Sequence, residues 1–530
     1  MLFDATAVLV ASLTVATVGG PVVLPENSGV SPISTSSSAH AGYAFTTPDA
    51  HAGYASKTPD ANALTAPAPH TFASLTSPAP HTLASLTAPA PHTLASLTSA
   101  TLAPMTPAPG RAIDLPTSLD QRSAPTVVAP ALPLAAEQLA TFSGSSLLHG
   151  LSALPPAAAA DFVTSHPHAV HELLSSPPAA HQVSSWWAGL DATAQRSLAA
   201  AAPEVVGNLD GVPFAVRNQA NRALLRSTIR DLELEADAAL GRAVATQNLH
   251  RLEMLYEVVD ALGPATANPP RSLLNLDTHG QGKAAVVLGD LETADYVSYM
   301  IPGMLVTVAG DIVGWTGFGA RLYDDQTSWL ALLAEAGAAT QEQTVATVAW
   351  IGYQTPSLMN VGSMDLAYEG RDAIAAAIDG LQTLRADDPP FVSLLTHSYG
   401  STAALLALED DTTVDALAMV GSPGSPAQSV DELNVRGDVF VGEAAWDPIP
   451  NSAFFGSDPG APSYGARVMS VLGSVDVITN EVLAGSAGHN EYWVPGTESM
   501  RNLALIAIDR GELVTDGSAL DAGRTLAMLR

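Results

Sequence analysis

The segment FVSLLTHSYGSTAALLAL, residues 391–408, carries the most informative pattern in this sequence. Its first part, residues 391–395, is an apolar run typical of a buried strand, and residues 402–408 favour a helix. Ser398 stands between them at the tip of a short turn, where Gly400 supplies a small neighbour. A strand, a sharp turn with a serine at its tip and a helix form the context of a nucleophile elbow. The sequence therefore predicts that Ser398 is a nucleophile; the alternative is an ordinary turn in which Ser398 caps the helix.

Apolar runs alternate with amphipathic segments on both sides of this stretch. The sequence predicts further strands at Tyr296–Ile301, Val345–Ile351, Ala416–Val420 and Val439–Val441, and helices at Ser328–Ala338, Leu366–Arg385 and Glu498–Asp509. Strands that alternate with helices indicate a mainly parallel sheet covered on both faces. We therefore expect one α/β domain over about residues 270–515, with the fold of an α/β-hydrolase.

An acid and a base are expected to follow the nucleophile in this order along the chain. His489 is the only histidine after Ser398, and it lies in a loop of small residues shortly before the last predicted helix. Asp447 follows the predicted strand Val439–Val441, and the prolines beside it stiffen its loop. The sequence predicts His489 as the base and Asp447 as the acid that orients it. A surface histidine remains an alternative for His489, and Glu443 is the second candidate for the acid.

Stabilisation of an oxyanion requires two backbone N–H groups. One is expected from Tyr399, directly after the nucleophile, and the other from Met304, in the loop after the strand Tyr296–Ile301. Gly303 would allow the backbone to approach the nucleophile closely. A plain turn at Pro302-Gly303 is the alternative.

The N-terminal part of the chain differs in composition from the rest. Residues 1–24 form an apolar, signal-like segment without a basic residue, so both cytoplasm and export stay open. Residues 25–133 carry eleven-residue repeats rich in Pro, Ala and Thr, which predict a disordered tail. Residues 134–265 are predicted to be helical, with one long amphipathic helix or two over Val216–Leu262. No stretch beyond the N-terminal segment is long and apolar enough to cross a membrane.

Composition narrows the classes of partner. The chain has 52 acidic and 21 basic residues and a net charge of −31, which argues against nucleic acid and against an anionic membrane surface. It has no cysteine, so disulfides and thiolate chemistry are excluded. The histidines at 166, 168 and 171 lie in a loop-like stretch and lack a carboxylate at ligand spacing, so no metal site is expected. Asp458 and Asp476 are predicted to be solvated loop charges. The oligomeric state stays open.

Several separate segments resemble one known family. They include Ala294-Asp-Tyr296 through Gly303, Trp350-Ile-Gly-Tyr353, His397-Ser-Tyr-Gly-Ser401, Asp447-Pro-Ile-Pro450 and His489 with Tyr492-Trp493, and a helical lead-in with Gly207-Asn-Leu-Asp-Gly-Val-Pro213. Together they resemble the actinobacterial α/β-hydrolase family catalogued as the domain of unknown function DUF1023. The resemblance covers about residues 186–510 and implies a hydrolase fold with a Ser-Asp-His triad at the positions named above. The chain departs from the family where Thr396 replaces a glycine and where Met304-Leu305 replaces Thr-Gly.

These observations lead to a functional hypothesis. Ser398 attacks an ester, thioester or amide of a small-molecule acyl substrate, and the triad needs neither a metal nor an organic cofactor. Two other hypotheses are a binding or scaffold protein on a degenerate hydrolase fold, and a secreted effector.

Overall fold

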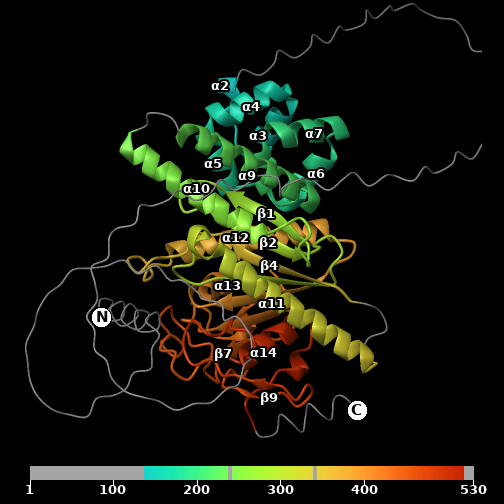
Figure 1. The fold of residues 1–530 in the computed structure, drawn as a ribbon, viewed down its shortest axis with the longest axis vertical. Coiled ribbons are helices and arrows are strands. Elements are labelled where there is room, and N and C mark those ends of the chain that lie inside the picture. The colour runs from blue at the N-terminus through green and yellow to red at the C-terminus, as the bar shows by residue number, and fades with distance from the viewer. Residues whose placement is uncertain (1–135, 237–240, 338–342, 519–530) are drawn as a thin grey trace, which may run out of the picture. The chain divides into compact units, whose positions relative to one another are not determined.

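The structure is a computed structural model that describes residues 136–236, 241–337 and 343–518 (Figure 1). The apolar N-terminal segment and the repeat-rich tail predicted from the sequence lie outside the described residues. Among the described residues, no helix has the length and apolar character needed to cross a membrane.

Within the described residues, eight strands form one sheet. In spatial order they are β1 Arg271–Asp277, β2 Lys283–Gly289, β4 Val345–Ile351, β3 Tyr296–Ile301, β5 Phe391–His397, β6 Ala416–Val420, β7 Val439–Gly442 and β8 Arg467–Val468. Strand β2 runs antiparallel to β1 and β4, whereas every pair from β4 through β8 is parallel. The mainly parallel sheet that the sequence predicts is confirmed. A separate small hairpin pairs β9 Ser474–Val475 with β10 Val482–Leu483.

Helices cover both faces of the sheet, as expected. They are α11 Val308–Glu335, α12 Asp365–Leu384, α13 Tyr399–Glu409 and α14 Glu498–Ala507. Alternate residues of each strand enter two different apolar cores: Val286 belongs to the core with α11 and α14, and Val287 to the core with α12 and α13. The period of two along a strand produces this separation. In Figure 1 the long helix α11 crosses the sheet.

The start of α11 was predicted wrongly. The sequence indicated a helix only from Ser328, but α11 begins at Val308, where the side chain of Thr307 caps it by accepting a hydrogen bond from Gly310 N–H. The first turns of α11 contain several glycines, which have low helix propensity and concealed the true start.

Strands β1 and β2 were not predicted at all. The first predicted strand is Tyr296–Ile301, but β1 already begins at Arg271. A register shift between Leu273 and Asn275 interrupts the alternation of side chains along β1, so that the consecutive residues Leu273 and Leu274 are both buried. A strand with such an irregularity lacks the period-two pattern on which sequence-based prediction depends.

The helical region contributes nine helices within the described residues. They are α2 Ala136–Leu139, α3 Gly144–Ala153, α4 Pro156–Ser165, α5 Pro167–Ser175, α6 Ala180–Ala188, α7 Ala192–Ala201, α8 Pro203–Asn208, α9 Phe214–Ala236 and α10 Arg242–Leu262. The segment Val216–Leu262 thus forms two helices rather than one. The loop expected around His168 was wrong, because Pro167 opens α5 at a position where a proline costs no hydrogen bond.

Two sets of contacts join the helical region to the sheet. Apolar side chains of α9 and α10, such as Leu225 and Leu255, belong to the same core as α11 and α14. Three asparagines bond to the backbone of the edge strand β1: Asn208 to both the N–H and the C=O of Leu276, Asn218 to Leu273 N–H, and Asn221 to Leu273 C=O. An unpaired strand edge is therefore covered by polar side chains.

Candidate active site

Ser398 lies directly after β5, at the edge where the parallel strands end. Its backbone has φ 53° and ψ −131°, a conformation that non-glycine residues rarely adopt. Ser398 occupies the N-cap position of α13, yet its side chain makes no capping hydrogen bond. The alternative in which Ser398 serves only as a helix cap is therefore not supported by the geometry. Backbone strain of this kind is typical of functional sites.

Glycines make room for this turn. A Cβ atom on Gly400 would lie 2.3 Å from Pro302 O, and one on Gly303 would lie 2.6 Å from the Cβ of Ser398. Neither position can hold a side chain without movement of the backbone. The structure thus gives Gly303 and Gly400 the close approach that the sequence suggests.

The three predicted triad residues meet in one hydrogen-bonded row. His489 Nε2 lies 2.8 Å from Ser398 Oγ, and His489 Nδ1 lies 2.8 Å from Asp447 Oδ2 and 3.0 Å from Oδ1. All three residues are buried, with exposed fractions of 3%, 8% and 2% for Ser398, Asp447 and His489. His489 is therefore not a surface histidine. The arrangement can remove a proton from the serine hydroxyl and stabilise the imidazolium that forms.

The electrostatics of Asp447 favour its ionised form. Burial alone would raise the pKa of Asp447, but hydrogen bonds from His489, Tyr492 and the Ile449 N–H outweigh burial and hold the pKa below its ordinary value. Glu443, the second candidate for the acid, instead accepts a hydrogen bond from Asn451. Burial raises the pKa of Glu443, so its environment does not favour the charge that the acid must carry.

Two backbone amides are available near Ser398. Tyr399 is the first residue of α13, so its N–H has no acceptor within the helix. Among the described residues, no acceptor is assigned to Met304 N–H, whereas the next amide, Leu305 N–H, donates to Pro356 O at 2.9 Å. Leu305 has φ 64°, which suits glycine better than leucine. Leu305 therefore has a left-handed backbone conformation at the position where the family that this chain resembles has a glycine.

Thr396 is the other departure from that family, and its side chain is buried with its hydroxyl hydrogen-bonded. It is fully buried, and its hydroxyl donates to Ala418 O of the neighbouring strand at 3.0 Å. The side chain therefore stabilises the pairing of β5 with β6 just before the turn.

Three residues with contacts to the row were not assigned a role from the sequence. Tyr492 donates a hydrogen bond to Asp447, His397 bonds through Nε2 to His489 O at 2.7 Å, and Gly421 lies against both Asp447 and His489. All three stand in segments that resemble the family, Gly421 in Gly421-Ser-Pro-Gly424, but the resemblance names no contact for them. Their contacts cannot be read from the sequence, because the partners are distant along the chain or on another loop.

Asp476 was predicted wrongly as a solvated charge. It is buried, and its Oδ2 accepts a hydrogen bond from Arg501 Nε at 2.7 Å. The ion pair fixes the loop after β9 to α14. Asp458, in contrast, is half-buried in its loop.

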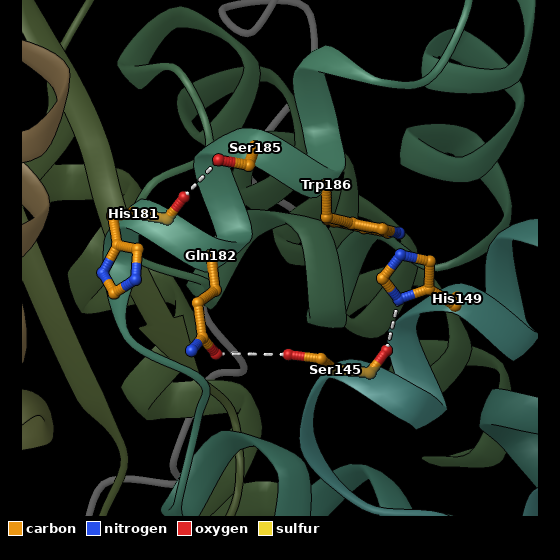
Figure 2. Close-up of a pocket in the computed structure, with 6 residues that line it drawn as sticks. All are labelled: Ser145, His149, His181, Gln182, Ser185 and Trp186. Carbon is orange, nitrogen blue, oxygen red and sulfur yellow. Dashed lines mark hydrogen bonds between the residues drawn. The ribbon is translucent and has the colours of Figure 1, made fainter.

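A hollow lies in the helical region, between α3 and α6 (Figure 2). Its volume is about 420 Å³, and it is lined by Ser145, His149, His181, Gln182, Ser185 and Trp186. Within the hollow, His149 bonds to Ser145 O and Ser185 bonds to His181 O. None of these residues belongs to the row around Ser398. No group of three or more metal-ligating side chains occurs in residues 136–236, 241–337 and 343–518.

Comparisons with known proteins agree with this architecture. A family model described as alpha/beta hydrolase matches residues 277–457, which include Ser398 and Asp447. An uncharacterised protein of Mycobacterium tuberculosis (strain ATCC 25618 / H37Rv) is 28% identical over 400 residues, covering 65% of this chain and 58% of that protein. The chain thus spans less than two thirds of the length of this relative.

Other similar proteins are shorter or more distant. An uncharacterised protein of Mycobacterium bovis is 30% identical over 210 residues, covering 36% of this chain and 74% of that protein. Among solved structures, a dienelactone hydrolase from Anabaena variabilis is 13% identical, with a TM-score of 0.27 over 46% of this chain and 97% of that one. An esterase from Pyrobaculum calidifontis is 14% identical, with a TM-score of 0.27 over 54% and 97%. Sequence identities and TM-scores this low give no information about the substrate of this chain. The matched family model and the fold both identify an alpha/beta hydrolase, and the Mycobacterium bovis protein is a relative of sufficient identity and coverage. The chain belongs to the alpha/beta hydrolase family.

Proposed function

We propose that this chain is a serine hydrolase that cleaves an ester, thioester or amide through an acyl-enzyme intermediate. The observation that carries the proposal is the buried row in which His489 bridges Ser398 Oγ and the Asp447 carboxylate. Membership of the alpha/beta hydrolase family supports it. We also propose the narrower assignment to the DUF1023 group, on the segments that resemble it.

The reaction proceeds in two balanced halves. Ser398 Oγ attacks the carbonyl carbon as His489 Nε2 takes the hydroxyl proton, and the tetrahedral oxyanion accepts hydrogen bonds from the Tyr399 and Met304 amides. Collapse breaks the bond to the leaving group, which receives the proton from His489. Water then attacks the acyl-serine, with His489 again as base, and releases the carboxylic acid. Asp447 remains ionised and holds the imidazole in the tautomer that carries its proton on Nδ1.

Turnover of activated esters tests the proposal. The wild-type protein is expected to hydrolyse at least one member of a p-nitrophenyl ester panel graded in acyl length, and Ser398→Ala should lose about 10³-fold or more of that rate. A matched control is Ser393→Ala, because Ser393 is a buried serine of β5, the strand that precedes Ser398, and its hydroxyl has no hydrogen-bond partner. Ser393→Ala should keep the wild-type rate. Equal rates for Ser398→Ala and the wild type would reject the proposal.

A further inference from the structure

We propose that Tyr492 is a positioning residue that holds the Asp447 carboxylate in register with His489. This inference rests on the proposed function, because it assigns a role within the same triad. Tyr492 lies on the His489 loop, not on the loop that carries Asp447, so it can fix one loop relative to the other.

The contacts of Tyr492 are specific. Its hydroxyl lies 2.7 Å from Asp447 Oδ2 and 2.8 Å from Ala444 N. The Ala444 amide can only donate, so the phenol oxygen accepts there and its own proton is directed to Asp447. The direction of both hydrogen bonds is therefore determined by chemistry.

Two side chains of one loop thus donate hydrogen bonds to the same carboxylate. His489 and Tyr492, three residues apart, both donate to Asp447 Oδ2, and Ile449 N–H donates to Oδ1 at 2.9 Å. Because Ala444 precedes Asp447 by three residues, Tyr492 contacts the acid loop at two points. Rotation of the carboxylate away from His489 would break these bonds together.

The hydrogen bond from the Tyr492 hydroxyl also stabilises the negative charge on Asp447. A hydrogen bond to a carboxylate stabilises its ionised form and weakens its attraction for a neighbouring proton. Without the phenol proton, Asp447 should hold the imidazolium of His489 more tightly. The other titratable groups beside Tyr492 are Glu443 and His397, whose ring lies 6.0 Å from the Tyr492 ring.

The hydroxyl can be separated from the aromatic ring by substitution. Tyr492 is fully buried in the core that contains α11 and α14, so Tyr492→Phe keeps the packing and removes only the hydroxyl. Tyr296→Phe is the matched control. The Tyr296 hydroxyl also accepts a 2.7 Å hydrogen bond, from Gln343. Tyr296 is the first residue of β3, so it lies at the amino-terminal ends of the parallel strands, whereas Ser398 lies at their carboxyl ends.

The experiment measures, in the full-length protein, the rate at which a fluorophosphonate labels Ser398 as a function of pH. In Tyr492→Phe the pH of half-maximal labelling rate should rise by about half a pH unit or more, and the maximal rate should fall about tenfold. Tyr296→Phe should leave both unchanged.

A pH profile of labelling that is the same in Tyr492→Phe and the wild type would overturn the inference. Loss of thermal stability without a change in this pH profile would likewise assign Tyr492 a purely structural role. Failure of the proposed function gives a different result, since the wild-type protein would then not be labelled at Ser398 at any pH.

Discussion

Gly421 lies against the two loops that carry Asp447 and His489. Its φ is +62°, and a Cβ atom there would lie 2.9 Å from Asp447 Oδ2 and 3.0 Å from His489 Nδ1. The residue follows β6, so the sheet brings backbone against the triad at a position where a side chain would displace it.

Gly421→Ala is therefore expected to lower the rate of ester hydrolysis about a hundredfold, because an error of about 1 Å in the triad has effects of that size. The control is Gly280→Ala, which has a similar φ of +58° and nothing within 4 Å of the added Cβ. Both variants should lose about 1 kcal/mol or more of stability from backbone strain alone. A normal rate in Gly421→Ala would contradict the crowding argument.

His397 gives the fold a dependence on pH. Burial, with added repulsion from His489, lowers the pKa of His397 to about 3. The folded protein thus keeps His397 neutral where an unfolded chain binds a proton, below about pH 6.5. The stability that the neutral ring contributes is complete above pH 6.5 and is lost as the pH falls toward 3.

His397→Gln should therefore flatten the fall in the free energy of unfolding between pH 6 and pH 4 by about 1.4 kcal/mol per pH unit. Glutamine keeps a donor for His489 O and does not titrate. Urea unfolding at several pH values measures the slope. Parallel curves for the variant and the wild type would show that His397 is not the group responsible.

At the scale of elements, the edge of the sheet depends on the helical region. Asn208 bonds with its amide to both backbone groups of Leu276, at 2.8 and 2.9 Å. Asn208→Ala should lower the free energy of unfolding by about 2–3 kcal/mol, because two partly buried backbone groups lose their partners. Chemical denaturation measures the change.

Asn248→Ala is the control for this prediction. Asn248 is exposed and donates to Glu235, so its loss should change stability by less than about 0.5 kcal/mol. Equal effects of the two substitutions would mean that the edge of β1 does not need Asn208.

The elements that sequence reasoning predicted are those with one unbroken pattern. Strands β3, β4 and β6 are buried apolar runs without interruption, and their predicted bounds agree with the structure. The edge strand β1 has a register irregularity and polar contacts instead, and its pairing depends on residues far away in the chain. A local pattern cannot represent partners that only tertiary structure brings together.

The candidate site divides in the same way. That Ser398 stands in a strand-turn-helix context was predictable from the local sequence, and the structure brings it into hydrogen-bond contact with His489, which in turn bonds to Asp447. The contacts of Tyr492, His397 and Gly421 were not predictable, because each joins loops that only the folded sheet brings together.

At the scale of the whole molecule, the last two helices of the helical region share a core with the sheet, whereas the earlier helices form a core of their own. Leu225 and Leu255 of α9 and α10 pack in the same cluster as residues of β1 and β2. A fragment of residues 266–530 would expose this apolar surface and the open edge of β1 together. We therefore expect the fragment to aggregate or to unfold, as measured by size-exclusion chromatography and circular dichroism; a monomeric folded fragment would show that the hydrolase part is independent.

Mass spectrometry of peptides after reaction with a fluorophosphonate probe tests most directly whether Ser398 is the nucleophile. We expect one adduct, on the peptide that contains Ser398. This adduct should disappear in Ser398→Ala, persist in Ser393→Ala and form much more slowly in His489→Gln. An adduct on a different residue, or equal labelling of Ser398→Ala and the wild type, would contradict this expectation.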